Sequence, residues 1–223
     1  MQATAMFWDI RAQKYDDDIK RHDFLYARTI ESTKSLLSNS DVVLDFACGS
    51  GEIGLDIARH AKQLHGIDAS AKMIELANQK IRDRRVRNAD FSHTDVFDPG
   101  LSESSFSAIT AFNIFHLLDD IPVVLARLHN LLAPGGLMVS QTPCLGERNL
   151  LVRALIGLAE RLGFAPPIRS LTSVELESLV SSCGFEILEN EVWDEKDAVQ
   201  RVVARKGGGA GAGSTTAVRR SRL

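Results

Sequence analysis

The sequence of 223 residues has few cysteines, no long apolar run and little net charge. Cys48, Cys144 and Cys183 are scattered and form no CxxC pair, so the pattern predicts neither a disulfide framework nor a zinc site. No run approaches the roughly 18 apolar residues of a membrane-spanning helix, and the acidic N-terminal stretch lacks the apolar segment of a secretory signal. These absences predict a protein of the reducing cytoplasm with no bound metal and no membrane partner.

The charge balance bears on the class of partner. The net charge is −3 at pH 7, and removing the three arginines of the last seventeen residues (Arg219, Arg220 and Arg222) leaves −6. An acidic body argues against binding dominated by nucleic-acid phosphates. The sequence therefore favours a small-molecule partner over DNA or RNA, and it leaves the oligomeric state open.

Apolar runs of strand length alternate with helical patterns along the chain, which is typical of a parallel sheet flanked by helices. The expected strands are 42–46, 63–67, 89–94, 106–112, 137–141, 185–192 and 199–204. Helix starts are expected at Ser70, at Asp119 or Asp120, and at the capping box of Thr172 and Glu175. The last two strands are close enough in sequence to form an antiparallel pair.

Three segments fall outside this alternation. Residues 1–40 are aromatic and mostly helical in pattern, and we expect them to cap the site. Residues 147–170 are expected to be a helical insertion, helical from Glu147 to Gly163, with one stripe formed by Leu151, Leu155, Leu158 and Leu162. Residues 207–223 are Gly-rich and basic and are predicted to be a disordered tail. Residues 1–206 are then predicted to form one domain.

The segment after the first expected strand carries most of the functional information. Gly49, Gly51 and Gly54 satisfy the pattern G-x-G-x-x-G between a strand and a helix, where backbone amides are free to bind a ligand. The same pattern binds dinucleotides, so a nicotinamide-dependent oxidoreductase is one hypothesis. Asp45, four residues before Gly49, would repel a pyrophosphate and attract an ammonium group. The context of the loop therefore favours a positively charged ligand.

The run VVLDFACGSGEIGLDIA (Val42–Ala58) resembles the first motif of class I S-adenosylmethionine-dependent methyltransferases. It departs at Ala47, where the family usually has its first glycine. Further motifs of the family resemble HGIDAS (65–70), TDVF (94–97), AFNIFHLLDD (111–120) and LLAPGGLMVS (131–140). The resemblance covers roughly residues 7 to 206. It implies an α/β fold with a Rossmann-like, mostly parallel seven-stranded sheet of order 3-2-1-4-5-7-6, the last strand antiparallel and helices on both faces.

The resemblance also implies contacts to S-adenosylmethionine. Asp68 would bind both ribose hydroxyls, Asp95 would accept a hydrogen bond from the adenine amino group, and Val96 would contribute its backbone. Asp45 would lie near the donor ammonium, with the sulfonium adding a second positive charge. Asp90 and Asp98 are alternatives to Asp95. The expected donor-binding set is Asp45, Ala47, Gly49, Gly51, Asp68, Ala69, Met73, Asp95, Val96 and Phe112.

His116 is the candidate catalytic residue because it follows the fourth strand, where the acceptor enters in related enzymes. A histidine with a pKa near neutrality suits a general base, and a packing histidine is the alternative. Pro143-Cys144 is similar to the nucleophile pair of cytosine-5 methyltransferases but follows the fifth strand, so we expect a loop role. The predicted activity is direct methyl transfer to a small molecule held between the N-terminal aromatics and the insertion. A domain that binds the donor without catalysis is the remaining alternative.

Overall fold

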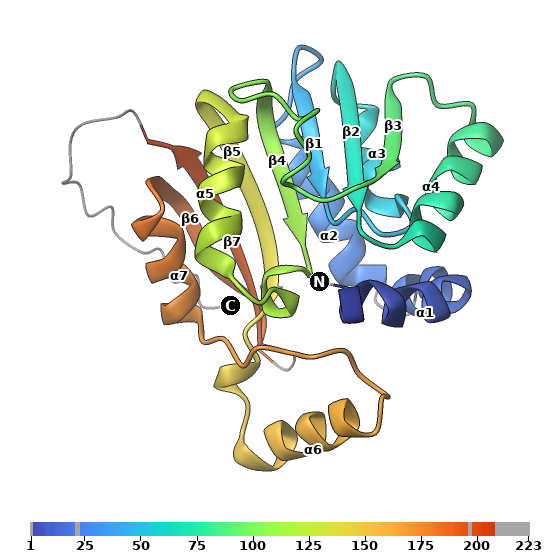
Figure 1. The fold of residues 1–223 in the computed structure, drawn as a ribbon. Coiled ribbons are helices and arrows are strands. Elements are labelled where there is room, and N and C mark those ends of the chain that lie inside the picture. The colour runs from blue at the N-terminus through green and yellow to red at the C-terminus, as the bar shows by residue number, and fades with distance from the viewer. Residues whose placement is uncertain (1, 21–22, 196–197, 208–223) are drawn as a thin grey trace.

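Seven strands form one sheet in the order β3-β2-β1-β4-β5-β7-β6 (Figure 1). The computed structural model describes residues 2–20, 23–195 and 198–207. The strands are β1 (Val42–Phe46), β2 (Gln63–Asp68), β3 (Ala89–His93), β4 (Phe106–Phe112), β5 (Leu132–Pro143), β6 (Phe185–Asp194) and β7 (Val199–Lys206). β7 pairs antiparallel with both β5 and β6, and the pairs among β1 to β5 are parallel. The predicted strand order and the antiparallel last strand are confirmed.

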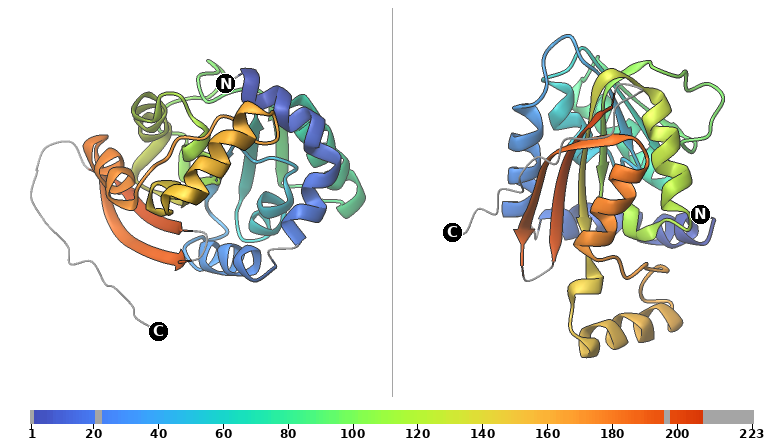
Figure 2. Two further views of the ribbon diagram at one scale, coloured as in Figure 1. Left: turned by 90° about the horizontal axis from the view of Figure 1, so that it is seen from below. Right: turned by 90° about the vertical axis from the view of Figure 1, so that its left-hand side faces the viewer.

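Helices cover both faces of the sheet (Figures 1 and 2). They are α1 (Gln2–Lys20), α2 (Asp23–Lys34), α3 (Glu52–Ala58), α4 (Ala71–Arg84), α5 (Ile121–Leu131), α6 (Leu150–Arg161) and α7 (Ser173–Ser182), with short 3-10 turns η1 (Phe115–Leu117) and η2 (Leu145–Glu147). Val43 packs in the cluster beneath α3 and α4, and its neighbour Leu44 packs in the cluster beneath α5 and α7. Successive side chains point to opposite faces of a strand, so a strand covered on both faces is a continuous apolar run.

Local capping signals begin several helices as expected. The side chains of Ser70 and Asp120 accept hydrogen bonds from the backbone at Met73 and Val123, and Thr172 with Glu175 forms the capping box. The helix expected over residues 147–163 is shorter, because Asn149 accepts from the amide of Val152 and begins α6 there. The strand expected at 137 begins at Leu132, which pairs with Phe106 of β4.

Two further features concern what the fold does not contain. No helix in residues 2–20, 23–195 and 198–207 is both long enough and apolar enough to cross a membrane. Within the same residues, no group of three or more His, Cys, Asp or Glu side chains is placed to hold a metal ion. Nearly all of the Gly-rich tail, from residue 208 on, lies outside the described residues.

Candidate active site

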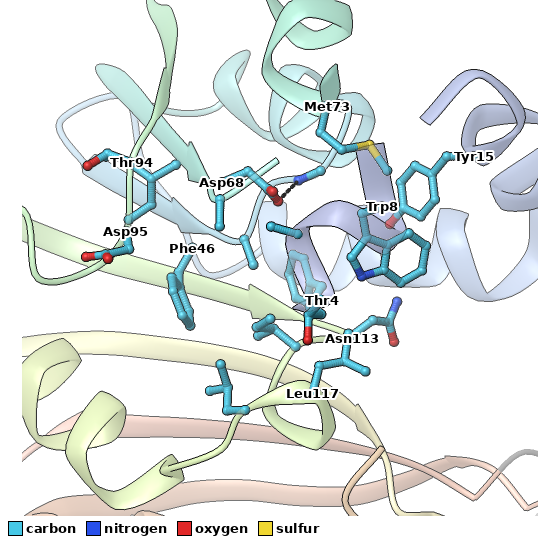
Figure 3. A pocket seen from close by; sticks show the side chains of 18 residues that line it. Thr4, Trp8, Tyr15, Phe46, Asp68, Met73, Thr94, Asp95, Asn113 and Leu117 are labelled. Atoms are coloured by element: carbon cyan, nitrogen blue, oxygen red, sulfur yellow. Dashed lines mark hydrogen bonds between the residues drawn. The ribbon is translucent and has the colours of Figure 1, made fainter. Parts of the chain in front are cut away.

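A cavity that is open to solvent lies at the carboxyl ends of β1, β2 and β4. Its walls come from α1, from the loops that follow these strands and β3, and from the start of α4 (Figure 3). Ligands of open parallel sheets bind at such carboxyl ends, where adjacent loops diverge. Seven residues of the expected donor set line this cavity: Ala47, Gly49, Asp68, Ala69, Met73, Asp95 and Phe112.

The loop after β1 turns through left-handed backbone at Ala47 (φ 57°), Gly49 (φ 56°) and Gly51 (φ 73°). A residue with a side chain costs roughly 1–2 kcal/mol in this conformation, and glycine does not carry that cost. The backbone at Ala47 thus explains the glycine that the resembling motifs have there. Gly51 is buried at the start of α3 and, unlike Ala47 and Gly49, is not part of the cavity wall.

Asp68 ends β2 with its carboxylate at the cavity (Figure 3). It accepts hydrogen bonds from the backbone amides of Gly49 (2.9 Å) and Ser70 (2.8 Å). Burial raises the pKa of this carboxyl group, and these two hydrogen bonds oppose the rise. One side chain therefore links the loop after β1 to the start of α4 and presents a hydrogen-bond acceptor to a ligand.

Asp45 lies behind the cavity wall and does not line the cavity. Its side chain belongs to a residue that is 3% exposed, and Oδ1 accepts a hydrogen bond from the hydroxyl of Thr110 (2.7 Å). Burial raises the pKa of Asp45 to about 7. A Cβ at Gly54 would lie 2.6 Å from Asp45 Oδ2, so the third glycine of the pattern lets α3 pack directly over this carboxyl group. Asp45 thus lies beneath the glycine loop and is separated from the cavity by that loop.

The loop after β3 forms the far wall. Thr94 and Asp95 line the cavity, and Asp95 Oδ1 accepts a hydrogen bond from the amide of Phe97 (2.8 Å). Val96 is fully buried and does not line the cavity, and its carbonyl oxygen accepts from Nε of Arg127 (3.1 Å). Met73, Ile67 and Phe46 provide the apolar side chains of the same half of the cavity, which is called the donor half below. The donor half can hold a flat apolar ring with a polar edge.

Helix α1 covers the opposite side of the cavity and reaches both of its halves. Trp8 and Tyr15 project from it to the cavity (Figure 3), and burial raises the pKa of the Tyr15 phenol. Two carboxylates hold the helix in place. Asp9 accepts from the hydroxyl of Ser70 (2.5 Å) and the amide of Lys72 (3.1 Å), and hydrogen bonding lowers its pKa.

The second carboxylate of α1 is Asp16, which accepts from the hydroxyl of Ser50 and pairs with the ammonium of Lys80 (2.6 Å). Asp9 and Asp16 are seven residues apart and share one face of α1, because 3.6 residues make one helical turn. Asp9 therefore attaches α1 to the segment that follows β2, and Asp16 attaches α1 to the loop that follows β1. Sequence reasoning missed this pair, although the spacing of seven was visible.

The other half of the cavity is formed mainly by apolar side chains, at Trp8, Phe112, Ile114, Leu117 and Leu118. Its polar side chains are those of Thr4 and Asn113 (Figure 3). Asn113 has left-handed backbone (φ 55°), and its N–H donates to the carbonyl of Gln141 (2.8 Å). Strained backbone of this kind is concentrated at functional sites. No side chain that is charged at neutral pH lines this half, which therefore suits an uncharged, apolar molecule.

His116 lies in η1 and is 8% exposed, and it is not part of the cavity wall although its neighbour Leu117 is. Its carbonyl accepts from the amide of Arg169 (2.7 Å), and Nδ1 has no hydrogen-bond partner within the described part of the chain. Burial lowers the pKa of the imidazole to about 4, so it is neutral at pH 7. The geometry favours the packing alternative over a general base in contact with the acceptor.

We expect His116→Gln to leave kcat nearly unchanged and to lower the free energy of unfolding by about 1 kcal/mol at neutral pH. The pKa of His116 is 6.5 in the unfolded chain and about 4 in the folded protein, so the unfolded chain binds a proton more readily. The protein therefore loses stability at this histidine as the pH falls from 6.5 toward 4. Methyl transfer and denaturant unfolding would be measured in parallel, with the exposed His60→Gln as control. A fall in kcat of about 10²–10⁴-fold with unchanged stability would instead establish the base role.

Comparisons with known proteins agree with this geometry. Residues 43–136 match the family model described as a methyltransferase domain. An uncharacterized methyltransferase of Anoxybacillus flavithermus is 26% identical over 189 residues, covering 79% of this chain and 86% of that protein. A 2-phytyl-1,4-naphtoquinone methyltransferase of Nostoc sp. is 33% identical over 100 residues, covering 43% of this chain and 44% of that protein. The chain thus matches less than half the length of this second relative.

Among solved structures, a SAM-dependent methyltransferase of Thermotoga maritima superimposes with a TM-score of 0.70 at 16% identity. The superposition covers 91% of this chain and 99% of that chain. At such identity the likeness concerns the fold.

Proposed function

The chain belongs to the class I S-adenosylmethionine-dependent methyltransferases, and from this premise we propose that it transfers the methyl group directly to a small, uncharged acceptor with an aromatic ring. Family membership makes the chain an enzyme and S-adenosylmethionine its cofactor, which decides against the nicotinamide-dependent alternative. The observation that carries the proposal is the acceptor half of the cavity, where aromatic and aliphatic side chains surround two uncharged polar side chains, those of Thr4 and Asn113 (Figure 3).

The residues around the other half fit the donor. The carboxylate of Asp68, at the cavity wall, suits two vicinal ribose hydroxyls, and Thr94 and Asp95 offer polar atoms at the edge of an adenine ring. Asp45, behind the glycine loop, supplies negative charge on the side where the ammonium and sulfonium would lie. S-adenosylmethionine contributes a methyl carbon activated by the sulfonium. In this assignment the chain's own residues hold the donor and exclude water from it.

The reaction needs an acceptor atom with an available electron pair. That pair forms the new bond to the methyl carbon, the carbon–sulfur bond breaks with its pair retained by sulfur, and the acceptor proton passes to solvent. Because no imidazole or carboxylate lines the acceptor half, the acceptor must itself ionise readily. A phenol or hydroquinone ring meets this condition, and Asn113 would hold its oxygen while Trp8 packs against its face. The naphthoquinone named for one relative has no ionisable hydroxyl itself, but its two-electron reduced form is a hydroquinone of this class.

We expect release of S-adenosylhomocysteine with a naphthohydroquinone as acceptor and none with histamine or an RNA oligonucleotide. Trp8→Ala should raise KM for the hydroquinone by about tenfold, because an aromatic face in contact with the ring is removed. Phe24→Ala is the matched control, since Phe24 is 79% exposed on α2 and does not line the cavity. Methylation of the amine or the RNA without turnover of the hydroquinone would contradict the proposal.

A further inference from the structure

Helix α6 stands away from the rest of the molecule. It lies beyond the carboxyl ends of the strands and crosses that side of the molecule when viewed from below (Figures 1 and 2). None of its residues is buried. Backbone and side-chain hydrogen bonds attach the flanking segments, from the amide of Gly146 to the carbonyl of Leu171 (2.7 Å) and from Arg11 Nη2 to the carbonyl of Phe164 (2.9 Å). The helix is thus held in place without a core of its own.

One exposed face of α6 is apolar. The leucines at 151, 155, 158 and 162 follow the spacing of a single helical face and are 71%, 57%, 53% and 60% exposed. Leu150 and Phe164 extend this surface at the two ends of the helix and are exposed to a similar degree. Together these six side chains are called the leucine face below. Contiguous exposed apolar surface of this kind marks an interaction site.

The charge around the leucine face is positive. Residues 147–169 contain four arginines and two glutamates, whereas the whole chain carries −3. Both glutamates are engaged with the protein: Glu147 accepts from the amide and hydroxyl of Ser173, and Glu160 accepts from the amide of Ile168. Arg153 and Arg161 are exposed on α6 itself. Such a surface complements an anionic partner and would repel a second copy of itself.

The same segment is hydrogen-bonded to neighbours of two residues that line the acceptor half of the cavity, although none of its own residues lines it. The carbonyl of Phe164 accepts a hydrogen bond from Arg11 of α1, which is one helical turn from Trp8. The amide of Arg169 donates a hydrogen bond to the carbonyl of His116, next to Leu117. Trp8 and Leu117 both line the cavity. An apolar molecule that leaves a surface in contact with α6 would therefore reach the cavity over a short path.

We propose that α6 docks the enzyme on an anionic lipid bilayer, lying in the plane of the membrane with the leucine face among the acyl chains. Arg153 and Arg161 then lie at the level of the lipid phosphates. Delivery of a lipid-dissolved acceptor to the cavity rests on the proposed function, whereas the docking itself does not. This contact is at the membrane surface. It differs from the sequence-based prediction of no membrane partner, which rests on the lack of a membrane-spanning helix and of a secretory signal.

The full chain should sediment with vesicles of phosphatidylcholine containing roughly 30% phosphatidylglycerol, and binding should weaken in about 0.5 M salt. Leu151→Gln together with Leu155→Gln should weaken binding at least about tenfold, because apolar contact with the acyl chains is removed. Both leucines are more than half exposed, so the fold loses no core. Val123→Gln together with Val174→Gln is the matched control on α5 and α7, where the valines are 50% and 72% exposed.

Unchanged vesicle binding by the leucine variant would overturn the proposal and show that the lipid contact does not depend on the leucine face. Absence of binding by the unmodified chain would also overturn it. Dimers in the absence of lipid that the leucine variant abolishes would show that a second copy covers the face instead. These measurements use neither donor nor acceptor, so they stand apart from the test of methyl transfer.

Discussion

Replacing Asp68 with alanine is expected to weaken S-adenosylhomocysteine binding by about 10²–10⁴-fold. The proposed role gives this carboxylate two ribose hydroxyls, and hydrogen bonds to a charged group contribute roughly 1.5–3 kcal/mol each. Asp68 already holds the amides of Gly49 and Ser70, so its removal also loosens the two loops that form the donor half of the cavity. Calorimetric titration of the purified variant measures the dissociation constant.

The control for Asp68 must remove a carboxylate without touching the site. Asp83→Ala serves this purpose, because Asp83 is exposed on α4 and accepts a hydrogen bond from the side chain of Gln79, one helical turn away. Asp68→Asn keeps the size of the side chain and one acceptor oxygen, and it should fall between the alanine variant and the unmodified enzyme. A dissociation constant that alanine leaves unchanged, in a protein shown to be folded by its unfolding transition, would mean that the ribose lies elsewhere.

The central part of the sheet could be predicted closely from the sequence. β1 and β4 have the expected ends, since strands covered on both faces are uninterrupted apolar runs. β5 begins five residues earlier than expected. Pro134-Gly135-Gly136 indicated the end of a helix, yet Leu132 pairs with Phe106 across a register shift in β4. Pairing between distant segments sets the first residue of β5, and the sequence around Leu132 alone does not indicate it.

The candidate site was predictable where one strand and its loop carry the contacts. Ala47, Gly49 and Asp68 line the cavity because they lie at the end of a recognisable strand or in the loop that follows it. Trp8 and Tyr15 could be expected in a cap, but their place in the cavity depends on how α1 packs against distant loops. The attachment of α1 through Asp9 and Asp16 depends on the same packing. These contacts are tertiary and appear only once the chain is folded.

His116 illustrates a different limit. Its position after β4 correctly indicated the neighbourhood of the cavity, and Leu117 and Leu118 do line it. In a 3-10 turn, however, successive side chains point about a third of a turn apart. The imidazole of His116 is thereby buried while the next residue lines the cavity. Sequence proximity placed the segment and left the direction of a single side chain undetermined.

The affinity for S-adenosylhomocysteine is expected to rise with pH and to level off above about pH 7. Burial raises the pKa of Asp45 to about 7, so at lower pH the unliganded enzyme holds this carboxyl group protonated. A bound ammonium group nearby favours the ionised form, so binding below pH 7 must release a proton. Each pH unit below 7 then weakens binding by up to about tenfold. The pKa of Asp68 is also raised, so a variant of Asp45 is needed to separate the two carboxyl groups.

Asp45→Asn is that variant, because an amide oxygen can still accept from Thr110 while the titration is removed. Its affinity should be lower at about pH 8 and nearly independent of pH. The proton release on binding below pH 7, measured in buffers of different ionisation enthalpy, should fall toward zero. Stability provides a second readout. An acid with a raised pKa contributes stability that is present below its unfolded value of 3.8 and is lost as pH rises through about 7. The variant should therefore lack this loss, and an unchanged pH profile of both binding and unfolding would show that Asp45 does not sense the donor charge.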